Sequence, residues 1–286
     1  MTPGAALSIS SDMVGTRVGP VSHAIDARWL QAYAAALGET DARYYDTLAP
    51  DGPAAHPVFA VCYEWPLALA IRAKTIGDEI APRGVHLAHD LTINRPPCTG
   101  DTLWTSARVV EVTRRPSGAR VTVRFETVDA DGAPVTTTDH ASVYRGAHVA
   151  GADRDTAREP PEAEPALEPV AAVSVPAYLA HVYSECARIW NPIHTDIAVA
   201  RRAGLPDIIL HGTATLALAV SRVLTALGDG DPRRVRRVAG RFTGMVRLPS
   251  TFTVRMAAGV TGATAIRFDA IGEDGRPVLS QGALYR

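Results

Sequence analysis

The chain contains few cysteines and no excess of either charge. Cys62, Cys98 and Cys186 are an odd number and lack the CxxC spacing of a zinc site. We therefore expect reduced thiols in a cytoplasmic protein, not a disulfide framework. The formal net charge is −1, which argues against nucleic-acid binding, because phosphate contacts call for an excess of basic residues.

Long apolar runs and glycine-rich phosphate loops are also missing. No stretch approaches the roughly 18 apolar residues that a membrane-spanning helix needs, and residues 1–17 lack the pattern of a signal peptide. Neither GxGxxG nor the P-loop pattern occurs, so nucleotide chemistry is not expected. The basic run at 233–237 is either a solvated loop or helix end, or a contact for phosphate groups.

What the sequence does contain is an internal repeat. Residues 124–135 read RFETVDADGAPV and residues 267–278 read RFDAIGEDGRPV, at an offset equal to half the length of the chain. Each copy predicts a β-hairpin with an Asp-Gly turn, and each soon reaches a Tyr-Arg pair. We interpret the chain as a duplication.

The repeat divides the chain into two halves. We expect an N-terminal repeat at 1–148, a linker rich in Pro, Glu and Ala at 149–173, and a C-terminal repeat at 174–286. A helical region should precede about four strands in each half, which indicates an α+β fold. The expected strands are 84–96, 101–114, 119–129 and 134–145, then 236–247, 250–260, 263–272 and 277–285. A continuous apolar face predicts a long helix over 216–227, with a counterpart over 59–76 that Pro66 should kink or delay.

Residues 183–212 carry the pattern that indicates chemistry. They read YSECARIWNPIHTDIAVARRAGLPDIILHG. Asn191-Pro192 predicts a turn that holds His194, and Thr195 or Asp196 should cap a short helix. The long helix begins soon afterwards. A histidine on a rigid turn beside a helix N-terminus suits thioester chemistry, because imidazole transfers protons near neutral pH and free N–H groups stabilise an oxyanion.

The NPIHTD…AG…ILHG arrangement resembles the active-site segment of the MaoC-like, or R-specific, enoyl-CoA hydratases and dehydratases. The resemblance implies a double hot-dog fold of the α+β class, in which an antiparallel sheet wraps a long helix in each repeat. It implies that His194 is the catalytic acid/base, that Asn191 positions the reactants and that the N–H of Gly212 completes the oxyanion hole. Asp196 matches an acidic position that follows the family's histidine and serves as a cap or orienting group.

One departure from the family pattern concerns the catalytic acid. The family reads Gly-Asp-x-Asn-Pro-x-His, whereas this chain has Arg188 and Ile189 at the first two positions. Three explanations stay open, the first being that an acid from elsewhere replaces the aspartate, with Glu185 and Asp196 as the nearest candidates. Alternatively, His194 acts alone in an elimination or isomerisation, or the fold binds a thioester-like ligand without turnover.

The first half resembles the degenerate repeat of two-hot-dog members. Glu39 stands in the Asp position, Asp41 in the Asn position and Tyr44 in the His position. The resemblance implies that this half does not catalyse in the usual way and instead widens the acyl-chain tunnel. We interpret three other histidines as structural or solvent-facing: His56, His86 and His89.

The expected function is that of a carbon–oxygen lyase. It would hydrate a 2-enoyl thioester or dehydrate a 3-hydroxyacyl thioester, carried by CoA or an acyl carrier protein. One alternative is a biosynthetic dehydratase, isomerase or cyclase on a polyketide-like substrate; another is a non-catalytic binding subunit. No metal or redox cofactor, nucleic acid or membrane is expected, and the chain would be a monomer or homodimer. The residues expected to bind substrate are His211, Ile189, Arg201 and Arg202, with the arginines at 233–237 as further phosphate contacts.

Overall fold

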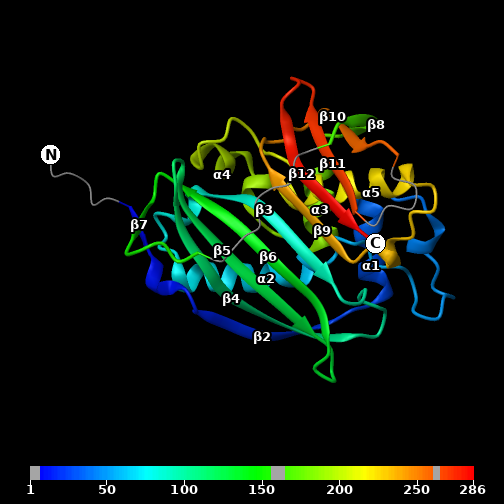
Figure 1. The fold of residues 1–286 in the computed structure, drawn as a ribbon, viewed down its shortest axis with the longest axis horizontal. Helices are drawn as coiled ribbons and strands as arrows, with labels where there is room; N and C mark the ends of the chain where they lie inside the picture. The colour runs from blue at the N-terminus through cyan, green and yellow to red at the C-terminus, as the bar shows by residue number, and fades with distance from the viewer. Residues whose placement is uncertain (1–6, 156–164, 260–264) are drawn as a thin grey trace.

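A single ten-stranded antiparallel sheet runs through both halves of the chain (Figure 1). The computed structural model describes residues 7–155, 165–259 and 265–286. Across the sheet the strands are β2 (Arg17–Ala24), β4 (Thr102–Arg115), β5 (Gly118–Val128), β6 (Pro134–Arg145), β3 (Gly84–Ile93), β9 (Arg237–Phe242), β12 (Pro277–Tyr285), β11 (Ala265–Gly272), β10 (Ser250–Ala257) and β8 (Leu167–Val175). A separate parallel pair joins β1 (Ser8–Ser10) to β7 (His148–Ala150).

The two halves meet in the middle of this sheet. Strand β3 of the first half pairs with β9 of the second half, and Asp90 lies opposite Ala239. On the same pair of strands, the Arg237 guanidinium contacts the Asp90 carboxylate at 2.6 Å. Five strands therefore lie on one side of this junction and five on the other.

The helices include one long helix in each half. The helices are α1 (Ala27–Ala36), α2 (Ala60–Thr75), α3 (Leu179–Ala187), α4 (Ile197–Arg202) and α5 (Gly212–Ala226), with 3-10 turns η1 (Ser11–Met13), η2 (Ala42–Tyr44), η3 (Ala81–Arg83), η4 (Pro192–His194) and η5 (Pro232–Arg234). Ten of the 15 residues of α5 are buried, and they include the apolar face that the sequence predicts. Pro66 lies inside α2 and does not delay its start. Within the described residues, no helix is both long and apolar enough to cross a membrane.

The predicted hairpins form in both repeats. Strands β5 and β6 pair across one Asp-Gly turn, and β11 and β12 pair across the other. Gly132 and Gly275 adopt φ values of 78° and 74° at these turns, a conformation that glycine tolerates best. The hairpin prediction is therefore confirmed in both copies.

The predicted linker at 149–173 is partly wrong. Residues 167–175 form β8, which pairs with β10 at the edge of the sheet. Edge strands such as β8 and β2 are largely exposed, so their sequences lack the strong apolar alternation of a half-buried strand. Residues 156–164 of the predicted linker lie outside the described part of the chain.

Candidate active site

A cavity of about 260 Å³ is lined by residues of both halves. The second half contributes the segment from Ile189 to His194, the stretch around Leu210 and the start of α5. The first half contributes α2 and the inward faces of β3, β5 and β6. The predicted chemical segment therefore opens onto a space that neither repeat encloses alone.

His194 lies on the cavity wall in a defined tautomer. It ends the η4 turn and is 8% exposed. Its Nδ1–H donates to the Ile209 carbonyl oxygen at 2.8 Å, which leaves Nε2 with a free lone pair. Burial lowers the pKa of His194 to about 4, so the side chain is a neutral base at physiological pH.

His211 packs directly against His194. The two rings stack with centroids 3.7 Å apart, and the Nε2 of His211 lies 3.2 Å from the Ser184 hydroxyl. Burial, and to a lesser degree the neighbouring His194, hold the pKa of His211 well below its usual value. Two neutral imidazoles therefore share one wall of the cavity.

The N-terminus of α5 reaches the same cavity at Gly212. Its first N–H groups have no partner within the helix and carry partial positive charge. A Cβ at Gly212 would lie 3.3 Å from the ring of Phe242. A glycine at this position therefore lets the Phe242 ring pack closely against the start of the helix.

Asn191 and Ile189 also line the cavity, where the sequence led us to expect a site. Asn191 is half-buried at the start of η4, and Ile189 is buried. Arg188, directly before Ile189, is left-handed with φ 57°. Gly38, directly before Glu39, is left-handed with φ 69°. The two halves therefore have the same backbone at matching positions.

The two acids that we expected to replace the family's aspartate do not reach the cavity. Glu185 is exposed on α3. Asp196 is also exposed, and its carboxylate accepts hydrogen bonds from the N–H groups of Ala198 and Val199 at the start of α4. Asp196 is therefore a helix cap, and the prediction of Glu185 or Asp196 as the catalytic acid is wrong.

The arginines expected near the phosphates fall into two groups. Arg201 and Arg202 are exposed at the end of α4, just before the cavity-lining residues Ala203 and Leu205. Their role as phosphate contacts stays a prediction.

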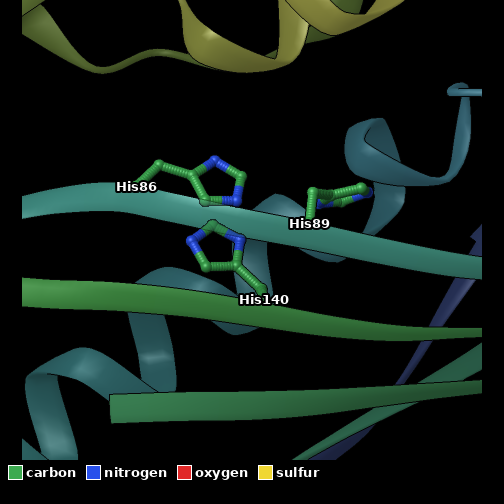
Figure 2. A group of neighbouring side chains, drawn as sticks. All are labelled: His86, His89 and His140. Carbon is green, nitrogen blue, oxygen red and sulfur yellow. The ribbon is translucent and has the colours of Figure 1, made fainter. Parts of the chain in front are cut away.

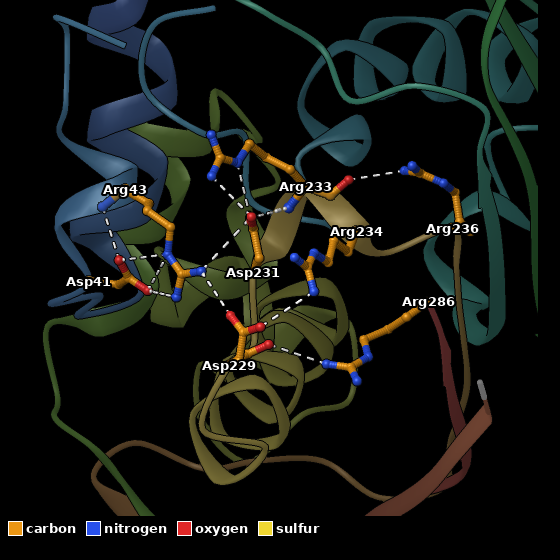
Figure 3. A network of polar contacts seen from close by, with 8 residues as sticks. All are labelled: Asp41, Arg43, Asp229, Asp231, Arg233, Arg234, Arg236 and Arg286. Carbon is orange, nitrogen blue, oxygen red and sulfur yellow. Dashed lines mark hydrogen bonds and ion pairs between the residues drawn. The ribbon is translucent and has the colours of Figure 1, made fainter. Parts of the chain in front are cut away.

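In the basic run at 233–237, Arg233, Arg234 and Arg237 form ion pairs, of which those of Arg233 and Arg234 are drawn in Figure 3. Arg233 contacts Asp231 at 3.0 Å, Arg234 contacts Asp229 at 3.3 Å, and Arg237 contacts Asp90. Local carboxylates therefore already pair with these three side chains, and a phosphate contact by this run stays a prediction.

Sequence reasoning missed several polar residues on the cavity wall. Glu64 of α2 is buried, and burial raises the pKa of its carboxyl to about 8. His86, His89 and His140 lie close together on β3 and β6 (Figure 2), although we had interpreted His86 and His89 as structural or solvent-facing. A carboxylate inside the apolar run of α2 was the one available signal.

Comparison with protein families gives a match in each half. Residues 169–270 match the model described as MaoC like domain, and residues 12–138 match the FAS1-like dehydratase domain region. Among curated proteins, the peroxisomal enoyl-CoA hydratase 2 of Arabidopsis thaliana is 42% identical over 53 residues, which is 18% of this chain and 17% of that protein. The chain thus matches less than a fifth of that relative's length.

Solved structures show the same fold over nearly the whole chain. A MaoC-like dehydratase from Phytophthora capsici superposes with a TM-score of 0.76 at 22% identity, covering 96% of both chains. A Mycobacterium tuberculosis protein described as a double hotdog fold gives a TM-score of 0.66 at 14% identity, covering 95% of both chains. The α+β double hot-dog prediction is confirmed.

Proposed function

Because the chain carries a MaoC-like domain at residues 169–270 and a FAS1-like dehydratase region at residues 12–138, we propose that it is a carbon–oxygen lyase of acyl thioesters. It interconverts a 2-enoyl thioester and a 3-hydroxyacyl thioester. The observation that carries the proposal is the His194 imidazole, fixed by Ile209 beside the N-terminus of α5 on one cavity wall. CoA or an acyl carrier protein holds the thioester, and the exposed Arg201 and Arg202 are the proposed phosphate contacts.

The geometry supports a mechanism in which His194 is the single acid and base. In the dehydration direction, Nε2 of His194 removes a proton from C2, and the electron pair moves onto the thioester carbonyl oxygen. The N–H groups at Gly212 stabilise that negative charge. The electron pair then returns from the oxygen to form the C2=C3 double bond as the C3–O bond breaks, and the proton on His194 passes to the departing oxygen, which leaves as water. The reverse sequence adds water to the enoyl thioester.

Ile189 at the family's Asp position is consistent with a mechanism in which His194 is the single acid–base group. Arg188 and Gly38 share the left-handed conformation, and Tyr183 and Tyr33 precede them at the same spacing. This symmetry supports Ile189 as the occupant of the family's Asp position, with no inserted residue before it. Burial lowers the pKa of His194 to about 4, so its protonated form is a strong acid toward the leaving hydroxyl group.

The test is hydration of trans-2-enoyl-CoA, followed by loss of the ultraviolet absorbance of the enoyl thioester. Crotonyl-CoA and a longer homologue should both be compared in the wild type and in His194→Ala. Turnover that His194→Ala abolishes supports the proposal. Turnover that survives in His194→Ala contradicts the assigned role. Binding of acyl-CoA without any turnover would instead identify a non-catalytic acyl-thioester-binding subunit.

A further inference from the structure

Three histidines are brought together by the register of β3 and β6. His89 lies directly opposite His140 on the paired strands. Residues three apart on a regular strand point to opposite faces, but the register shifts between His86 and Ala88. This bulge turns His86 to the same side as His89, and bulges often redirect a side chain beside a functional site. Figure 2 shows the three rings side by side.

These three histidines line the cavity, and burial lowers the pKa of each, so all three are neutral at neutral pH. Burial lowers the pKa of His89 to about 4 and that of His140 to about 3. His89 is 1% exposed, and neither of its ring nitrogens has a partner in the described part of the chain. A buried polar atom without a partner is costly, so a ligand that supplies one would bind favourably here.

Other polar groups complete this part of the cavity wall. Glu64 accepts a hydrogen bond from Thr138 at 2.5 Å, two residues before His140 on β6. Its raised pKa, about 8, leaves it protonated and able to donate at neutral pH. Arg72 of α2 also lines the cavity, and its positive charge helps to lower the pKa of His140. The protonated Glu64, the Arg72 guanidinium and the three imidazoles can all form hydrogen bonds with an oxygen-bearing group.

A metal ion fits this cluster less well. The ligand atoms of the three histidines lie within 4.8 Å of one another, whereas three nitrogens around one Zn²⁺ are about 3.4 Å apart. The rings of His86 and His140 are parallel within 3°, so their lone pairs do not converge. The nearby guanidinium of Arg72 repels a cation as well.

The cluster lies one aromatic ring away from the proposed oxyanion site. The His86 ring is 4.5 Å from the Phe242 ring, centroid to centroid. The other side of the contact is Gly212, whose absent Cβ would lie 3.3 Å from Phe242. An acyl group whose thioester lies at Gly212 can therefore extend past Phe242 toward the histidines.

We propose that His86, His89 and His140, with Glu64 and Arg72, bind an oxygen-bearing group on the distal part of the acyl chain. The inference rests on the proposed function for the position of the thioester. The substrate class is therefore an oxygenated acyl thioester, with a hydroxyl, keto or carboxylate group beyond the reacting carbons. This chemistry favours the polyketide-like substrate over a plain fatty acyl chain.

The test compares acyl-CoA probes that differ only at the end of the chain. Dissociation constants of octanoyl-CoA, 8-hydroxyoctanoyl-CoA and the CoA monothioester of octanedioic acid are measured by calorimetry, which needs no turnover. We expect at least one oxygenated probe to bind about 10-fold more tightly than octanoyl-CoA, since a hydrogen bond to a buried polar group is gained. The hydroxyl and carboxylate probes distinguish a neutral from an anionic group.

His89→Leu should abolish the preference by weakening the oxygenated probe and strengthening octanoyl-CoA. His148→Leu, on the exposed strand β7, is the matched control and should keep the wild-type ratio. Equal binding of all three probes by the wild type overturns the inference, even if His89→Leu fails to fold. Saturable binding of Zn²⁺ that His89→Leu removes also overturns it. A preference for oxygenated probes without hydration of any enoyl-CoA contradicts the proposed function alone.

Discussion

The two halves of the molecule place the same backbone around different chemistry. In the second half, η4 ends in His194, which stacks on His211 at 3.7 Å. In the first half, η2 ends in Tyr44, which faces His56 with ring centroids 6.0 Å apart. The interplanar angles are 26° and 25°. The two halves share this 3-10 turn, and the residue that ends it gives one site an imidazole and the other a phenol.

The surroundings of the two pairs differ as much as the pairs themselves. His211 and His194 open onto the cavity of about 260 Å³, whereas His56 borders a void of about 10 Å³. His56 is hydrogen-bonded to Ser221 of α5, whose hydroxyl also donates to Glu39. Ser221 of the second half thus fills the site of the first half with hydrogen bonds, whereas strands β3 and β6 of the first half line the larger cavity that both halves enclose. After duplication, the second half carries the proposed catalytic residues and the first half contributes part of the cavity wall.

Removing the His194 imidazole of the second half should cause the largest loss of activity. His194→Ala should lower kcat/KM for enoyl-CoA hydration by about 10²–10⁴-fold, the usual contribution of a general acid–base group. Tyr44→Phe is the matched change in the first half and should cost less than about 3-fold. Steady-state kinetics on both variants measure the contrast. A comparable loss in both would mean that the two sites are coupled or that neither is catalytic.

Closing the start of α5 should have the next largest effect. Gly212→Ala places a methyl group against Phe242, which shifts the helix N-terminus away from the oxyanion. We expect kcat to fall about 10–100-fold, within the range for weakened oxyanion stabilisation. Thermal unfolding of the same variant separates this effect from misfolding. An unchanged kcat would remove the α5 N-terminus from the mechanism.

The buried Glu64 carboxyl should make stability depend on pH. Its pKa is about 8 in the folded protein, above the usual 4.5, because burial disfavours the ionised form. The contribution of Glu64 to the free energy of unfolding is fully present below about pH 4.5. It is lost as pH rises toward 8, at about 1.4 kcal/mol per pH unit. Denaturant unfolding from pH 5 to pH 8 should show this slope in the wild type.

Glu64→Gln keeps the shape of the side chain and cannot ionise, so the slope from this group should disappear. Glu79→Gln changes an exposed acid and is the matched control. If the wild type and Glu64→Gln have the same slope, the carboxyl is ionised when folded.

The pH dependence of kcat/KM tests whether His194 acts as the base. The neutral imidazole is the form that removes the C2 proton, and its pKa is lowered to about 4. Activity should therefore fall by about 10-fold per pH unit only as pH drops below about 4, not near 6.5. Rates measured in a series of buffers test this. A limb near 6.5 would show that His194 is not buried in the working enzyme.

The smallest expected effect concerns the charged contacts that join the halves. Arg43 of the first half lies 3.9 Å from both Asp229 and Asp231 of the second half (Figure 3). Because these groups are partly exposed, Asp229→Ala should cost at most about 1 kcal/mol of unfolding free energy. The loss should shrink at high salt. A larger loss in denaturant unfolding would show that the contact orders the junction between the repeats.

Local pattern in the sequence determined much of this protein. The repeated hairpins, the long helix α5, the Asp196 cap and the turn that presents His194 all follow from contacts between residues near in sequence. Side-chain period, turn chemistry and capping act over a few residues, so they can be recognised without a structure. The edge strand β8 could not be recognised in this way, because its exposed side chains leave a weak pattern.

Only the tertiary structure decided which groups share the cavity. Glu64, His89 and His140 belong to three different elements, and the β-bulge that turns His86 inward leaves no mark that the sequence reveals. Glu185 and Asp196 are close to His194 in sequence, yet their elements direct them toward solvent. Residues that are neighbours in the sequence determine the backbone turn at His194. Sheet register and helix packing determine which side chains come together in the cavity.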